Sequence, residues 1–177
     1  MKSLTIKSIE EINLIKDLYK RKNQTRDLLM FLIAINTGIS LVDLLNLKVK
    51  DVKDKLYLSN GKQKAVPLNN EILELIPKVI DGQPLSAYVF KNQFGNKIDR
   101  GGIFHLFKNV CTELGLNDKY SVASWRKTFA YHYYMKYQDL SYLQWLFHQA
   151  TAEQALSFID EDEDENMNLR YRKGVCL

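Results

Sequence analysis

The sequence is poor in cysteine, with only Cys111 and Cys176 among its 177 residues. Because the two lie far apart and form no C-x-x-C pair, they suggest neither a zinc site nor a disulfide framework. The three histidines, His105, His132 and His148, have no metal-ligand spacing either. We expect His105 and His132 to be buried or half-buried, and His148 to lie at the surface or at a helix cap. The sequence therefore predicts no cofactor, no metal site, and a protein of the reducing cytoplasm.

Long apolar runs are also absent. No run approaches the roughly 18 residues that a membrane-spanning helix needs, and residues 1–11 lack the apolar core of a signal peptide. With 46% apolar residues, however, the chain can bury a hydrophobic core, and its length suits one domain. We expect a soluble protein with no membrane partner.

Acidic residues are unevenly distributed, which hides how basic most of the chain is. Six of the 21 acidic residues form one run, Asp160–Glu165. Without that run the chain has 25 basic and 15 acidic residues, a balance of +10, against +4 for the whole sequence. Such a body favours a polyanionic partner, usually nucleic acid, although a lysine-rich surface kept for solubility explains the charge equally well.

Hydrophobic periodicity predicts a mainly helical chain. Ser8 and Glu11 form a capping-box pattern at the start of an amphipathic helix over residues 6–21. A nearly all-apolar helix follows over 25–36, with Gly38 as its terminator. The later expected elements are a short helix at 69–79, a brief strand at 88–90, a helix at 101–114, and two or three helices within 120–159.

One small antiparallel sheet is expected between these helices. Within residues 49–68, Leu56 and Leu58 alternate with polar neighbours, and Asn60-Gly61 is a strong signal for a two-residue type I′ turn. The predicted fold class is therefore α+β, mainly α-helical, with a small antiparallel β-sheet.

Two stretches, TGISLVDLLNL at 37–47 and SWRKTFA at 124–130, resemble the catalytic domain of tyrosine recombinases, the phage integrase family. The resemblance covers residues 1–159 in family order and spacing, and leaves 160–177 as an acidic, flexible tail. It implies that family's catalytic-domain fold and double-stranded DNA as the partner. Two hypotheses for the tail stay open: it is disordered and self-repelling, or it folds back over the basic face that contains Arg126 and competes with DNA.

The resemblance identifies six catalytic positions, of which only Arg126 keeps the family residue. Ser40 stands where an arginine clamps the scissile phosphate, and serine has no bidentate fork. Phe158 stands where the tyrosine nucleophile attacks phosphorus, and phenylalanine has no oxygen to do so. The complete set of positions is Ser40, Ser59, Ala123, Arg126, Gln149 and Phe158.

The lysine that acts as general acid in the family is not placed by the sequence. A register anchored on 66–68 puts it at Ser59, whereas a register anchored on the turn makes Lys62 or Lys64 the candidate. A lysine near a hairpin can equally contact phosphate or protect an edge strand.

These substitutions predict a catalytically inactive DNA-binding protein, such as a regulator or a remnant from a mobile element, with no small-molecule substrate. One face alone grips DNA weakly, so a homo-oligomer or a full-length recombinase is a possible partner. Two alternatives stay open: an active or trans-assisted integrase, in which a tyrosine such as Tyr171 rescues cleavage, and a protein that modulates a full-length recombinase. The expected DNA-binding residues are Arg126, Lys127, Lys62, Lys64, Lys91, Lys97 and Arg100.

Overall fold

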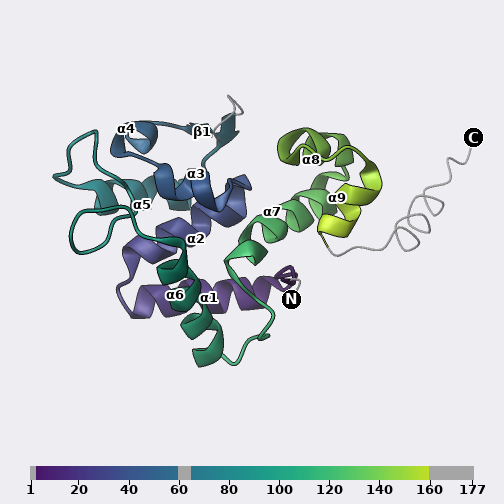
Figure 1. Cartoon of the computed structure of the whole chain (residues 1–177), viewed down its shortest axis with the longest axis horizontal. Coiled ribbons are helices and arrows are strands. Elements are labelled where there is room, and N and C mark those ends of the chain that lie inside the picture. Colours follow the sequence, from purple (N-terminus) through teal and green to yellow (C-terminus); the bar gives the residue numbers. More distant parts are fainter. Residues whose placement is uncertain (1–2, 60–64, 160–177) are drawn as a thin grey trace, which may run out of the picture. The chain divides into compact units, whose positions relative to one another are not determined.

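The computed structural model describes residues 3–59 and 65–159, and these residues are mainly helical (Figure 1). The chain divides into a first unit, Met1–Phe129, and a second unit, Ala130–Leu177. None of the described helices is long and apolar enough to cross a bilayer. The elements are α1 (Ile9–Arg21), α2 (Thr25–Thr37), α3 (Leu41–Asn46), α4 (Val49–Val52), β1 (Tyr57–Ser59), β2 (Ala65–Pro67), α5 (Asn70–Ile80), α6 (Arg100–Glu113), α7 (Val122–Tyr137), α8 (Leu140–Phe147) and α9 (Ala152–Phe158).

Helix α1 begins where the sequence predicts, but its capping box is only half formed. The Ser8 hydroxyl accepts a hydrogen bond from the Glu11 amide at 3.2 Å, as expected of an N-cap. The Glu11 carboxylate does not close the box; it accepts a hydrogen bond from the Tyr120 hydroxyl at 2.8 Å. Glu11 therefore ties α1 to the segment that leads into α7.

Helix α2 forms the centre of the first unit because it is apolar on almost every face. All residues from Leu28 to Ala34 are buried. The Phe31 ring lies 6.2 Å from that of Phe107 on α6 and 5.8 Å from that of Trp125 on α7. Such aromatic pairs stabilise a core beyond the area they bury. The prediction that this helix is buried is confirmed.

The predicted sheet is confirmed as a two-stranded antiparallel pair, β1 with β2, but three details differ. Residues 49–52 form helix α4 rather than strand, and Leu56 is exposed, so Leu58 alone supplies the apolar face of β1. Ser59 pairs with Ala65, whereas a two-residue turn at 60–61 would pair it with residue 62. The turn itself, residues 60–64, lies outside the described residues.

Three other sequence predictions have mixed outcomes. The strand expected at 88–90 is reduced to an isolated bridge between Lys48 and Tyr88. Three helices, α7 to α9, fill the stretch for which two or three were expected. His132 is half-buried and His148 is exposed at the C-cap of α8, as predicted, whereas His105 is exposed rather than buried.

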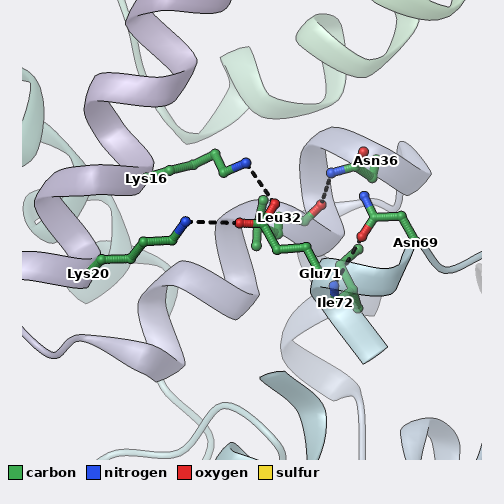
Figure 2. A network of polar contacts seen from close by, with 7 residues as sticks. All are labelled: Lys16, Lys20, Leu32, Asn36, Asn69, Glu71 and Ile72. Atoms are coloured by element: carbon green, nitrogen blue, oxygen red, sulfur yellow. Dashed lines mark hydrogen bonds and ion pairs between the residues drawn. The ribbon is translucent and has the colours of Figure 1, made fainter. Parts of the chain in front are cut away.

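Helix α5 is fixed to α1 by a shared carboxylate (Figure 2). Glu71 accepts from Lys16 at 2.6 Å and from Lys20 at 3.2 Å, one turn apart on α1. Asn69 caps α5 as predicted, accepting from the Ile72 amide at 3.0 Å. Burial raises the pKa of the Glu71 carboxyl, but the hydrogen bonds and charges of the two lysines outweigh burial and lower the pKa overall.

We predict that Glu71→Gln lowers the free energy of unfolding by about 1 kcal/mol near pH 7, because two partly exposed ion pairs are lost. The lysines hold the folded-state pKa of Glu71 below its unfolded value of about 4.3. The ion pairs therefore stabilise the fold above that value, and their contribution is lost as pH falls through the folded-state pKa. Urea unfolding from pH 7 to pH 3 measures the difference.

A matched control is Glu74→Gln, which removes the same charge from an exposed position one turn along α5. Among the described residues, no ion pair is found at Glu74. The control should unfold like the wild type across the pH range, and an equal loss in both variants would contradict a specific role for Glu71.

Candidate functional site

The turn between α2 and α3 is held by its own side chains. The buried Thr37 hydroxyl donates to the Ile33 carbonyl at 2.7 Å and accepts from the Ile39 amide at 3.3 Å. Gly38 adopts φ 64°, in the left-handed region that favours glycine and ends α2. The TGIS stretch therefore forms a fixed turn whose backbone carbonyls can anchor other groups.

Ser40 is the N-cap of α3. Its hydroxyl accepts from the Asp43 amide at 3.1 Å and donates to the Asp43 carboxylate at 2.6 Å. Ser40, at the position where the resemblance expects a phosphate-clamping arginine, thus satisfies a free amide at the start of a six-residue helix. The Ser40 hydroxyl therefore stabilises the start of α3.

Arg126 reaches the same turn from α7. Its Nε donates to the Gly38 carbonyl at 3.0 Å, and the side chain is half-buried. Burial lowers the pKa of the guanidinium, and the nearby Asp43 carboxylate opposes that shift. The group stays protonated, because an arginine pKa lies far above neutral pH. The structure therefore places the Arg126 guanidinium at the turn that precedes Ser40.

Ala123 and Lys127 lie beside Arg126 on α7, and neither offers a charged group to a ligand. Ala123 is exposed one turn earlier and carries only a methyl group. Lys127 is only 8% exposed, and its Nζ donates to the Ser3 carbonyl at 2.8 Å. The assignment of Lys127 to DNA contact is corrected, because its ammonium holds the N-terminal segment instead.

Ser59 lies at the end of β1 on the rim of an open groove of about 750 Å³ formed by α3, α4 and the sheet. Asp43 and Asn46 of α3 line the same groove, so it begins beside the turn that holds Arg126. Lys50 and Lys55 contribute two exposed cations that the sequence analysis overlooked. Their place in the sequence could have revealed them, because they lie just before the hairpin in which a catalytic lysine was expected. Lys62 and Lys64 lie outside the described residues.

The loop that carries the basic residues expected at 91–100 is attached to the C-terminal end of α3, the end away from the α2–α3 turn. Lys91 and Lys97 form a bridge across a short loop, and Arg100 is exposed at the start of α6. The Lys97 ammonium donates to the Asn46 side chain at 2.8 Å. Since α3 has six residues and spans about 9 Å, Lys97 and Arg126 are held near opposite ends of one short helix.

The remaining two positions belong to the second unit. Gln149 is half-buried and follows α8, and its backbone amide donates to the backbone carbonyl of Gln144 at 2.9 Å. Phe158 is the last residue of α9, and its ring lies 5.1 Å from that of Phe147. Phe158 therefore packs as an ordinary half-buried aromatic residue, with no polar atom in its side chain.

Known proteins resemble the chain over most of its length. Residues 2–158 match the family model described as "Phage integrase family". The protein named "Probable integrase/recombinase YoeC" from Bacillus subtilis (strain 168) is 30% identical over 165 residues, covering 90% of this chain and 90% of that protein.

Solved structures confirm the predicted fold. XerA recombinase matches with a TM-score of 0.77 at 16% identity, over 98% of this chain and 67% of its own. XerH site-specific recombinase, in a post-cleavage complex with palindromic difH substrate, matches with a TM-score of 0.70 at 21% identity. That match covers 96% of this chain and 53% of XerH, so the chain spans about half of that recombinase.

We predict that Ser40→Ala lowers the free energy of unfolding by about 1 kcal/mol, because the Asp43 amide loses its cap. Ser40→Gly should cost only a few tenths of a kcal/mol, since glycine is tolerated at an N-cap. Urea unfolding of both variants measures the effect. Equal stability of Ser40→Ala and the wild type would show that the cap does not hold α3.

Proposed function

Because the chain belongs to the phage integrase family, we propose that it binds double-stranded DNA through the first unit and does not cleave it. The observation that carries this proposal is that the expected catalytic positions keep a phosphate-attracting group but not the groups that act on the phosphodiester bond. Arg126 keeps its guanidinium at the α2–α3 turn, whereas Ser40 is committed to a helix cap and Phe158 has no hydroxyl. Such a site keeps a group that attracts phosphate and lacks the groups that break the phosphodiester bond.

The magnitudes favour loss of cleavage over slow cleavage. Removing one preorganised donor costs about 10² to 10³ in rate, and removing an arginine that stabilises phosphoryl transfer costs about 10³ to 10⁵. The losses are not additive, but a missing nucleophile cannot be offset by the remaining groups. Ser40, Ala123 and Phe158 together therefore leave no route to a covalent intermediate at the family position.

Binding needs fewer parts than cleavage. Phosphate contacts position a protein on DNA and supply most of the sequence-independent affinity. Arg126, Lys97 and Arg100 supply such contacts on the first unit, and Lys91 lies at the root of the same loop as Lys97. Lys50 and Lys55 extend the surface along the groove beside Ser59. The DNA-bound XerH structure supports duplex DNA as the ligand class.

In the cell, such a protein fits a regulator or a remnant of a mobile element that occupies recombination sites. A homo-oligomer, or assembly with a full-length recombinase, would add the contacts that a single domain lacks. The specific alternative is an active recombinase, favoured by the 90% mutual coverage with a probable integrase/recombinase. In that case a tyrosine other than residue 158, such as Tyr171, supplies the nucleophile.

We predict that Arg126→Ala weakens DNA binding and makes it less sensitive to salt. Each phosphate contact adds about 0.9 to the slope of log K against log salt, so the variant's slope should be shallower by about 1. Fluorescence anisotropy with a labelled duplex at 50 to 200 mM salt measures both quantities. A urea unfolding curve of the variant separates lost binding from lost folding.

The matched control is Arg21→Ala, which removes the same charge from an exposed position on α1. This variant should keep the wild-type slope. If the wild type itself does not bind duplex DNA at low salt, DNA binding is wrong, and co-purification with a recombinase would point to a modulating partner instead.

We also predict that the wild type forms no covalent adduct with DNA, because Phe158 offers no oxygen to phosphorus. The assay is denaturing electrophoresis after incubation with a nicked suicide duplex of a sequence selected by the protein. A band that resists denaturation in the wild type and disappears in Tyr171→Phe would overturn this proposal in favour of the active alternative.

A further inference from the structure

Phe94 is the most exposed large apolar side chain in the described residues, at 77% of its surface. It lies in the loop between α5 and α6, a segment that extends away from the helices of the first unit (Figure 1). Burying a phenylalanine ring in the core stabilises a fold, and the exposed position of Phe94 forgoes that stabilisation.

The loop around Phe94 is tightly built. The Asn92 side-chain oxygen accepts from the amides of Phe94 at 2.9 Å and Asn96 at 3.1 Å. The backbone amide of Asn92 donates to the backbone carbonyl of Asn96 at 2.8 Å, and the Gly95 amide donates to the backbone carbonyl of Asn92 at 3.0 Å. Gly95 adopts φ 80°, with nothing within 4 Å of where a Cβ would stand. The ring is therefore presented on a closed turn whose tip projects into open space.

The root of the loop is attached to the elements that form the candidate site. Lys91 and Lys97 bridge across its base, and the Lys91 carbonyl accepts from Arg26 Nη1 on α2 at 3.0 Å. Lys97 donates to Asn46 at the end of α3, the helix whose other end lies beside Arg126. The base of the loop that carries Phe94 is thus attached to the helix whose other end lies at the α2–α3 turn, within one unit.

The charged residues on either side of Phe94 in the sequence are mainly basic. Lys91, Lys97 and Arg100 flank it within ten residues, and the one acidic residue of that stretch, Asp99, is used to cap α6 through the Gly102 amide at 2.8 Å. An exposed aromatic side chain on a hydrogen-bonded turn, with cations before and after it in the sequence, matches the way proteins insert apolar wedges between base pairs while holding the flanking phosphates. A purely apolar protein partner would leave those cations unexplained.

We propose that Phe94 inserts between two adjacent base pairs of the DNA that the first unit binds, unstacking that step and kinking the duplex. This inference rests on the DNA binding proposed above, and Lys91, Lys97 and Arg100 contact the phosphates beside the step. Because the loop is ordered by its own hydrogen bonds, little conformational freedom is lost when the ring enters the stack.

The test uses the full chain and a selected duplex carrying the fluorescent base 2-aminopurine at successive positions. With the wild type we expect the fluorescence of one step to rise several-fold as its bases unstack. Phe94→Ala should abolish the rise and weaken binding about tenfold, within the range for losing one aromatic ring stacked on a base. The salt slope should not change, because phenylalanine carries no charge.

Phe104→Ala is the matched control, since it removes a ring that is 47% exposed on α6. It should bind and unstack DNA like the wild type. If Phe94→Ala keeps the wild-type affinity and fluorescence while Arg126→Ala still loses salt sensitivity, the wedge is wrong and DNA binding stands. Loss of a protein complex in Phe94→Ala, with DNA binding intact, would assign the ring to a protein partner. Absence of DNA binding by the wild type would overturn both proposals.

Discussion

The geometry of the candidate site depends on one long-range hydrogen bond, from Arg126 Nε to the Gly38 carbonyl. A half-buried guanidinium is costly unless its protons find acceptors. The C-terminus of α2 provides one, because its last carbonyls lack partners within the helix and carry the negative end of the helix dipole. The left-handed Gly38 ends α2 at that point. The same bond therefore satisfies the end of α2 and places a cation at the α2–α3 turn.

Helix α3 depends on this turn more than on its own sequence. Six residues are too few to form a stable helix alone, since nucleation is unfavourable and few hydrogen bonds follow. Its N-terminus is satisfied by the Ser40 cap, and its C-terminal Asn46 accepts from Lys97. Burial of Leu44 and Leu45 then fixes the helix on the core. An arginine at position 40 would bring charge to this turn but remove the cap that starts α3.

The sequence predicted what is decided locally. Ser8, Gly38 and Asn69 act at helix ends as expected, because capping depends on residues within one turn. It failed where distant packing decides. Lys127 is buried because it meets Ser3, 124 residues away, and no local pattern carries that information. The hairpin register follows the burial of Leu58 opposite its partner strand rather than the turn signal at 60–61.

The placement of Arg126 beside Ser40 came from the resemblance and not from periodicity, because their elements are separated by most of the first unit. The resemblance did not give the structural roles of Arg126 and Ser40. Arg126 donates to the Gly38 carbonyl at the end of α2 and Ser40 caps the start of α3, so both have structural roles that do not depend on catalysis. The fold at this turn therefore does not require a catalytic group at position 40 or 158.

A protein that only binds DNA needs this frame as much as one that cuts it. Phosphate contacts set the register of a protein on the duplex, and their contribution grows when the cations are held in place before binding. Here the α2–α3 turn that Arg126 contacts lies at one end of α3, and the Lys97 ammonium donates to Asn46 at the other end, so both cations are attached to the same short helix. A nucleophile adds nothing to that attachment. The geometry of binding therefore does not depend on whether residue 158 can act as a nucleophile.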